Sequence, residues 1–182
     1  MAKNCRDVYL IQNKNTGILF EGWWSNDICE IYLCKIDENK QVELREKIYG
    51  SIVRDTATAS GFVTEGYRIV FGTWRGTRRY EITSDMQLEP AEDFQIKNDN
   101  EEFITLKQDL LVDVLIDETW CTIECKANTK FYPTATDCEE YVYLKMDNGE
   151  IVRIKYTIID DYLVYVDGIP VEELFDGIKF AG

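Results

Sequence analysis

Short runs of β-branched, aromatic and aliphatic residues, separated by polar turn signals, recur along this chain and constrain its fold more than any other feature. The clearest example is Glu140–Met146 followed by Ile151–Ile159, with Asp147-Asn148-Gly149-Glu150 between them. Asn148-Gly149 favours a two-residue turn, because both residues tolerate a positive φ. This segment is therefore predicted to form a β-hairpin.

The same pattern predicts further strand pairs. Val8–Ile11 and Ile18–Phe20 are apolar and are separated by a polar, glycine-containing turn. Tyr67–Trp74 and Thr77–Thr83 flank Arg75-Gly76, which is predicted to be a hairpin turn. Antiparallel pairing of neighbouring segments is the expected result.

Two segments are predicted to be helical. Residues 107–118 carry Leu110, Asp113, Val114 and Asp117 near helical spacing, which favours a helix there. Residues 171–175 are predicted to form a short terminal helix that ends at a glycine. The predicted fold class is mainly β or α+β, with antiparallel meander sheets in a sandwich or partly open barrel and one or two short helices.

Negative charge is unevenly distributed. Residues 1–90 contain 13 acidic and 12 basic residues, whereas residues 91–182 contain 21 acidic and 8 basic residues. The whole chain has a net charge of −14, and nearly all of it comes from the second half. The expected organisation is a near-neutral β-rich half at 1–90 and an acidic β-rich half at 91–182, or one single domain. Residues 31–49 resemble residues 142–159, which fits either a duplicated β unit or two ordinary meander hairpins.

Missing residue types and motifs argue against several classes of enzyme. The chain contains no histidine, so Ser-His-Asp and Cys-His sites and histidine-ligated zinc are excluded. It has no phosphate-binding loop, no dinucleotide-binding glycine motif and no nucleophile elbow. A non-enzymatic protein without a cofactor is expected. The first residues are polar and no apolar run is long enough to cross a membrane, which predicts a cytoplasmic protein without membrane contact.

The six cysteines are expected to be reduced, buried thiols rather than disulfides or metal ligands. Cys29 and Cys34 are an odd number of residues apart, so a strand would place them on opposite faces. Cys121 and Cys125 share a face but lie ~13 Å apart along a strand, which is too far for one tetrahedral zinc site. No metal site is predicted.

The acidic half is expected to be folded, because its acids are interleaved with aromatic and aliphatic residues. A folded acidic surface repels nucleic acid and membranes and can imitate nucleic acid for a basic partner. The candidate partner-binding residues are Asp99, Glu101, Glu102, Asp109, Asp113, Asp117, Glu118, Glu139, Glu140, Asp160 and Asp161.

The predicted function is therefore an acidic binding or inhibitor protein that blocks a basic, nucleic-acid-handling partner such as a nuclease. Phage or mobile-element inhibitors such as anti-CRISPR proteins, and immunity proteins against nuclease toxins, share this physical profile. A carboxylate- and tyrosine-based or metal-assisted hydrolase and a small-ligand β-barrel are the alternatives. The sequence predicts no particular oligomeric state.

Arginine and tryptophan form a second candidate patch in the near-neutral half. Arginine combined with aromatic rings can clamp phosphates and stack bases, but the same arginines can also pair with acids within the chain. The residues of this patch are Trp23, Trp24, Arg68, Trp74, Arg75, Arg78 and Arg79.

Overall fold

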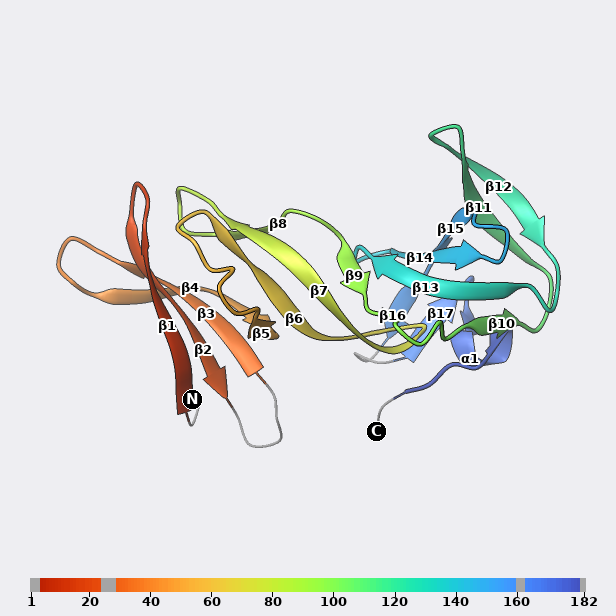
Figure 1. The fold of residues 1–182 in the computed structure, drawn as a ribbon, viewed down its shortest axis with the longest axis horizontal. Coiled ribbons are helices and arrows are strands. Elements are labelled where there is room, and N and C mark those ends of the chain that lie inside the picture. Colours follow the sequence, from red (N-terminus) through yellow and green to blue (C-terminus); the bar gives the residue numbers. More distant parts are fainter. Residues whose placement is uncertain (1–3, 24–28, 160–162, 181–182) are drawn as a thin grey trace. The chain divides into compact units, whose positions relative to one another are not determined.

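The computed structural model describes residues 4–23, 29–159 and 163–180, and antiparallel strands make up most of this part of the chain (Figure 1). The chain divides into two compact units. Unit 1 comprises Met1–Gly66 and Thr77–Glu92, and unit 2 comprises Tyr67–Gly76 and Asp93–Gly182. The predicted fold class is confirmed: the described residues form sheets of 4, 12 and 3 strands, none of which closes into a barrel.

Unit 1 is built around a four-stranded meander. Its core packs one face of that meander against a second layer of strands, with Leu19, Ile31, Leu33 and Phe62 buried. The strands are β1 (Asn4–Gln12), β2 (Thr16–Trp23), β3 (Cys29–Ile36), β4 (Val42–Tyr49), β5 (Ser51–Ile52) and β8 (Leu88–Pro90), while β6 (Gly61–Val70) and β7 (Gly72–Ile82) contribute to both units.

Unit 2 contains the remaining strands and the short terminal helix, which is confirmed, although it ends at Leu174, where Phe175 becomes extended and begins a strand, and not at a glycine. Its core gathers Phe71, Phe94, Phe131 and Phe175, all of which are fully buried. The elements are β9 (Phe94–Ile96), β10 (Ile104–Leu106), β11 (Leu110–Ile116), β12 (Thr119–Cys125), β13 (Lys130–Thr136), β14 (Tyr141–Met146), β15 (Ile151–Lys155), β16 (Thr157–Ile159), β17 (Leu163–Val166), β18 (Ile169–Pro170), α1 (Val171–Leu174) and β19 (Phe175–Asp176).

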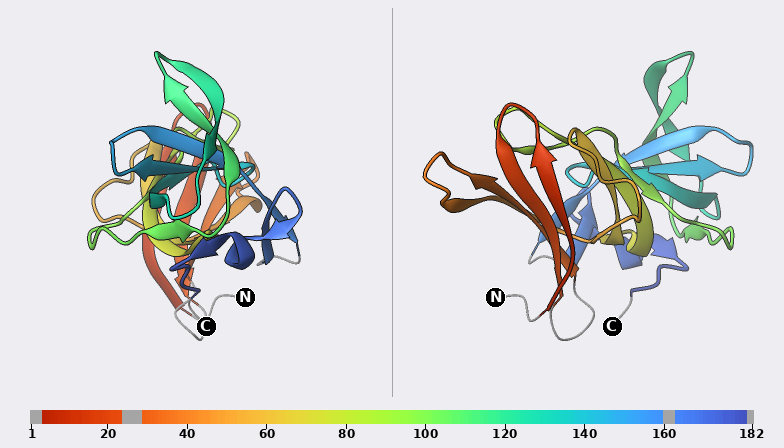
Figure 2. Two further views of the ribbon diagram at one scale, coloured as in Figure 1. Left: turned by 90° about the vertical axis from the view of Figure 1, so that its right-hand side faces the viewer. Right: turned by 60° about the vertical axis from the view of Figure 1, so that its left-hand side comes forward.

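The helix predicted near 107–118 is wrong, because this segment forms strand β11 and the turn after it. Leu110, Val112 and Val114 are buried while Leu111 is 63% exposed, which is the period-two burial of a strand. Asp117 and Glu118 form a two-residue turn, with φ of 47° and 63°. Figures 1 and 2 show the resulting β11–β12 hairpin projecting from the other strands of its unit.

Two predicted turns also differ from the structure. Arg75 and Gly76 lie inside β7, and the chain reverses instead at Gly72, whose φ is 115°. The β14–β15 hairpin is confirmed, but its loop contains three residues and not two, because Met146 pairs with Glu150. Within this loop only Gly149 has a positive φ. A three-residue loop of this kind is common when a glycine follows a turn.

Among the described residues, no helix has the length and apolar character needed to cross a membrane. The six cysteines all lie in the described part of the chain, and none of them forms a disulfide. Cys29, Cys34 and Cys125 are buried as predicted, whereas Cys5 and Cys121 are exposed. The exposure of Cys121 follows from its place near the tip of the β11–β12 hairpin, where few other strands cover it.

Candidate functional site

One side of the sheet in unit 2 faces away from the core and carries a cluster of aromatic and charged side chains. The strand order β12-β11-β15-β14-β13 brings together strands from distant parts of the sequence (Figure 1). The register then places their outward side chains in neighbouring rows. We call this side the open face and define it by its outward residues, which are Leu111, Asp113, Leu115, Trp120, Thr122, Glu124, Tyr141, Tyr143, Lys145, Arg153 and Lys155.

Alternation along each strand produces this arrangement. In β14, Val142 and Leu144 point into the core and are fully buried, so Tyr141 and Tyr143 point outward. The register places Arg153 directly between Tyr143 on one neighbouring strand and Asp113 on the other. Three strands thus present an aromatic ring, a guanidinium and a carboxylate side by side.

Arg153 is the centre of the cluster. Its Nε donates a hydrogen bond to Asp113 Oδ2 at 3.2 Å, and its guanidinium lies 4.4 Å from the ring centroids of both Trp120 and Tyr141. Trp120 also contacts Tyr143, with their ring centroids 6.2 Å apart. Cation–π contacts and a charge-assisted hydrogen bond therefore hold Arg153 in one orientation.

The Arg153–Asp113 pair is partly desolvated, since its side chains are only 24% and 30% exposed. Asp113 also accepts a hydrogen bond of 2.8 Å from the Thr122 hydroxyl, so the carboxylate has a partner on each neighbouring strand. Tryptophan, tyrosine and arginine are the residues enriched in the energetic centres of protein interfaces. A rigid group of these residues on an uncovered sheet face is suited to binding another protein.

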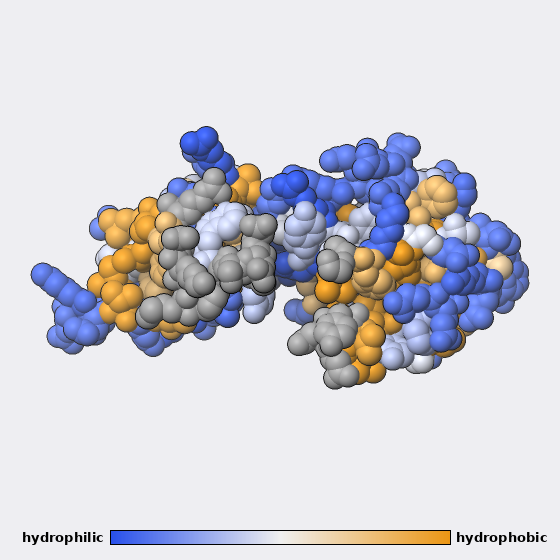
Figure 3. Space-filling model, turned by 90° about the horizontal axis from the view of Figure 1, so that it is seen from below, coloured by the Kyte–Doolittle hydropathy of each residue, from blue (hydrophilic) through white to orange (hydrophobic). Residues whose placement is uncertain are grey.

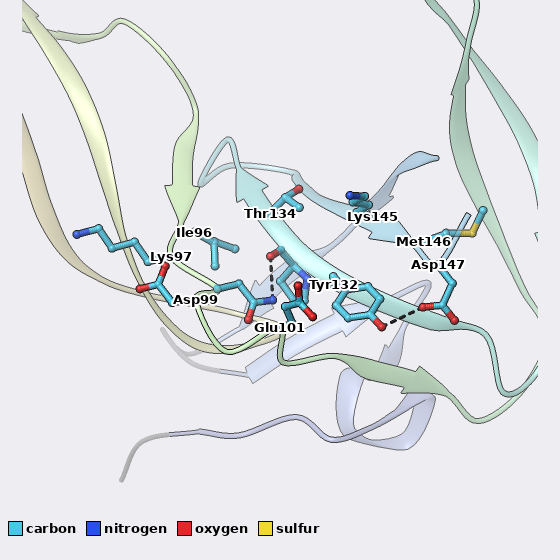
Figure 4. A pocket seen from close by; sticks show the side chains of 11 residues that line it. Ile96, Lys97, Asp99, Glu101, Tyr132, Thr134, Lys145, Met146 and Asp147 are labelled. Carbon is cyan, nitrogen blue, oxygen red and sulfur yellow. Dashed lines mark hydrogen bonds between the residues drawn. The ribbon is translucent and has the colours of Figure 1, made fainter. Parts of the chain in front are cut away.

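A pocket of about 550 Å³ adjoins the open face, where β13 and the loop after β9 meet (Figure 4). Its lining includes Asp99 and Glu101 from the loop, Tyr132 from β13 and Asp147 from the β14–β15 turn. Asn98 fixes the loop, because its side chain donates to the Glu102 carbonyl at 2.7 Å and accepts from the Glu102 amide at 2.7 Å. The pocket thus places two predicted acids beside an aromatic ring.

Tyr132 donates a hydrogen bond from its hydroxyl to Asp147 Oδ1 at 2.9 Å. This bond to a carboxylate, followed by partial desolvation and the negative charge of Asp147 and Glu101, raises the pKa of Tyr132 above its ordinary value. The phenol therefore stays protonated at neutral pH. It can act there as a hydrogen-bond donor, whereas a general base needs a pKa near the working pH.

Replacing Asp147 with asparagine should lower the pKa of Tyr132 toward 10.0, because a neutral acceptor stabilises the protonated phenol less than a carboxylate does. A pH titration of the Tyr132 Cζ resonance by NMR measures this shift. Glu124→Gln removes the same charge from a carboxylate that does not contact Tyr132, so this control should leave the pKa where it is in the wild type. An unchanged pKa in Asp147→Asn would contradict the role of the hydrogen bond.

Several of the predicted partner-binding acids are paired within the chain. Lys126 Nζ lies 2.8 Å from Asp109, Lys155 lies 3.1 Å from Glu140, and Lys179 lies 2.9 Å from Glu102. The hydrogen bonds from Lys126 and the Ala127 amide lower the pKa of Asp109. These carboxylates are partly neutralised, which reduces the charge that they can offer to a partner.

The other predicted acids lie at separate turns of unit 2. Asp117 and Glu118 form the exposed tip of the β11–β12 hairpin, and Glu139 is exposed in the turn before β14. Asp160 and Asp161 lie outside the described residues. The structure therefore brings Asp99 and Glu101 together in the pocket and places Asp113 in the aromatic cluster.

The second candidate patch is divided between the two units. Trp74 is buried and donates its indole hydrogen to the Phe71 carbonyl at 3.0 Å, so it belongs to the core of unit 2. Arg68 in the same unit lies 5.1 Å from the Phe94 ring centroid, and Arg75 is exposed. In unit 1, the Arg78 Nε donates to the Glu92 carbonyl at 2.9 Å and Arg79 is exposed.

The tryptophan pair of that patch belongs to unit 1. The Trp23 indole donates a hydrogen bond to the buried Glu21 carboxylate at 3.0 Å, so this tryptophan has a structural role within unit 1. Trp24 lies outside the described residues.

Sequence reasoning missed Trp120, Tyr141, Tyr143, Arg153 and the pocket residue Tyr132. The available signal was the alternation of Tyr141, Tyr143 and Lys145 opposite Arg153 and Lys155 across a recognised hairpin. Residues 4–23, 29–159 and 163–180 contain no group of three or more cysteine or carboxylate side chains placed to hold a metal ion. Comparisons with protein families, curated proteins and solved structures found no match to this chain.

Proposed function

We propose that this chain is a non-enzymatic binding protein that uses the open face of unit 2 to block a basic, nucleic-acid-handling protein. The observation that carries this proposal is the cluster of Trp120, Tyr143 and Arg153 on an uncovered sheet face, bordered by acidic turns. The rings and the apolar side chains of Leu111 and Leu115 supply area that a partner can bury. A nuclease bound by a phage-type inhibitor or by a toxin-immunity protein is a partner of this kind.

The exposed acids have a different role from the aromatic cluster in this proposal. Asp117, Glu118 and Glu139 lie on turns around the face, where they attract a basic surface and remain partly solvated. Charges at the rim of an interface mainly raise the association rate and make binding sensitive to salt. The paired Asp113 instead orients Arg153, so its removal would disturb the cluster itself.

A carboxylate- and tyrosine-based hydrolase is the alternative that one observation favours, namely the Tyr132–Asp147 hydrogen bond inside a pocket. The raised pKa of Tyr132 weakens this alternative, because the phenol is a poor general base at neutral pH. The carboxylates that line the pocket are at least as well suited to binding a hydrogen-bond donor or a cationic side chain of the partner as to hydrolysis.

A pull-down with the immobilised full-length chain tests the proposed function. Basic nucleic-acid-binding proteins should be retained from a host lysate at low salt, and high salt or added duplex DNA should release them, because both compete for the partner's basic groove. Retained proteins that are neither basic nor displaced by DNA would argue against the proposal. Hydrolysis of a nucleotide or glycoside substrate that depends on Tyr132 and Asp147 would favour the alternative.

Neutralising the hairpin tip with Asp117→Asn and Glu118→Gln should weaken partner binding about fivefold at low salt, at roughly 0.5 kcal/mol for each rim charge. The loss should shrink at high salt, because screening already weakens these contacts. Asparagine tolerates the positive φ at position 117, so the turn should persist. Titration calorimetry at two salt concentrations measures both effects.

A matched control for the hairpin variant removes two exposed carboxylates from turns of unit 1, with Glu38→Gln and Asp85→Asn. It changes the net charge of the chain by the same amount and should leave binding within twofold of wild type. Equal losses in the two variants would show that net charge, and not the hairpin tip, governs association.

A further inference from the structure

Unit 1 exposes an apolar sheet surface on the side of β1–β4 that faces away from its core. Val8, Leu10, Val42 and Leu44 are 63%, 65%, 61% and 54% exposed. Figure 3 shows hydrophobic colour gathered over the part of the surface that these strands build. We call this surface the outer sheet face and define it by its outward residues, which are Val8, Leu10, Ile18, Phe20, Tyr32, Cys34, Ile36, Val42 and Leu44. Among them Cys34 is only 6% exposed, because its neighbours on this side cover it.

The strand register aligns these side chains in continuous rows. Leu10 pairs with Ile18, Ile18 with Cys34, and Cys34 with Leu44, so one apolar row crosses all four strands. In the next row Phe20 and Tyr32 stack with their ring centroids 4.9 Å apart. The face is therefore an ordered apolar surface and not a set of scattered residues.

The opposite side of the same sheet is buried in the core of unit 1. Ile11, Leu19, Ile31 and Leu33 alternate with the outer residues and are at most 1% exposed. Antiparallel sheets that meet water on one side usually carry polar residues there. A meander that is apolar on both sides has the pattern of a sheet that is covered on both sides.

We infer that a second copy of this chain covers the outer sheet face, so that two β1–β4 sheets pack face to face about 10 Å apart. One apolar row crosses all four strands, and the rows on either side are apolar over two or three strands, one beginning with Gln12 and Thr16 and the other ending at Lys47. With strands ~4.8 Å apart and rows ~6.7 Å apart, the apolar surface extends roughly 15–20 Å in each direction. Contiguous apolar surface of this extent marks an interaction site. It lies at the low end of specific interfaces, which predicts a dimer with a Kd on the order of 10 µM.

The lack of unpaired charge on the outer sheet face favours a second copy of the chain over the basic partner proposed for unit 2. The residues that define the outer sheet face are uncharged, and the two charges on the same side of the sheet, Lys47 opposite Tyr32 and the buried Glu30, pair with each other at 2.9 Å. Residues 1–90 are nearly balanced in charge, so two copies of a chain with net charge −14 can meet at this face with little repulsion. A basic protein would find no carboxylate among the residues that define this face to pair with.

Sedimentation of the full-length chain with reductant present tests this inference. The wild type should change from monomer to dimer between about 1 and about 200 µM. Leu10→Glu with Leu44→Glu should remain monomeric throughout, because two faces with buried unpaired carboxylates repel one another. Both positions are more than half exposed, so the circular dichroism spectrum and the Tm should stay close to wild type.

Two further variants make the result specific. Leu111→Glu changes an equally exposed leucine in unit 2 and should leave the dimer intact. Mixing Leu10→Glu/Leu44→Glu with Leu10→Lys/Leu44→Lys should produce a heterodimer from two monomeric variants. A wild type that stays monomeric up to the highest concentration, or a dimer that the glutamates do not weaken, would overturn the inference. Neither result bears on partner binding by unit 2, which is measured separately.

Discussion

Replacing Trp120 with alanine should weaken binding of the basic partner by about 30-fold or more, which corresponds to the 2 kcal/mol or more of an interface hot spot. Trp120 supplies one of the two rings that hold the Arg153 guanidinium, and it also contacts Tyr143. Its removal therefore takes away contact area and releases a partly desolvated arginine at the same time. Calorimetry with the partner identified by pull-down measures the loss.

The half-buried Trp120 also contributes to folding, so its loss should lower the free energy of unfolding by roughly 2 kcal/mol. Val142→Ala separates that effect from binding, because Val142 is fully buried on the inner side of the same sheet and its truncation costs a similar amount. This control should bind the partner nearly as well as wild type. Equal loss of affinity in both variants would mean that destabilisation, and not the open face, explains the result.

Tyr67→Ala tests the competing arginine-rich patch. Tyr67 is 65% exposed on β6, next to Arg68, and lies outside the open face. Binding should stay within about twofold of wild type. A large loss in this variant together with normal binding by Trp120→Ala would move the interface from the open face to the β6–β7 hairpin.

Many strand positions could be predicted from this sequence, because the strands are short and their side chains alternate between a buried side and a side that faces water. Alternation and turn residues then identify hairpins such as β1–β2 and β14–β15 directly. The strand within residues 107–118 is wrongly predicted as a helix, because Leu111, Leu115 and Ile116 are apolar although they are exposed. An apolar run on both sides of a strand has no period of two, and its spacing then resembles a helix.

The candidate site could not be predicted from the sequence, because it depends on whether the loop of the β14–β15 hairpin has two or three residues. A two-residue turn at Asn148-Gly149 would pair Arg153 with Leu144, which points into the core, whereas the three-residue loop pairs it with Tyr143. A shift of one residue moves a side chain to the other face of the sheet. The Asp113–Arg153 contact also joins strands 40 residues apart, and no local pattern encodes that strand order.

Gly76→Ala should destabilise the chain by about 3 kcal/mol, at the upper end of the usual cost of overpacking. A Cβ at this position would lie 2.1 Å from the Gln95 carbonyl oxygen and 2.6 Å from the Phe94 ring, so β9 would have to separate from β7. Phe94 is fully buried, and moving it opens the core of unit 2. Thermal unfolding should report a Tm lower by roughly 6–12 °C.

Gly149→Ala is the matched control for this glycine. Its φ is 89° and no atom lies within 4 Å of an added Cβ, so only backbone strain of roughly 1–2 kcal/mol opposes the substitution. A turn glycine thus costs less to replace than a glycine on which another strand packs. If Gly76 occupied a hairpin turn, as the sequence predicts, the two variants would lose similar stability. The larger loss expected for Gly76→Ala therefore tests directly whether Gly76 lies inside β7 against β9.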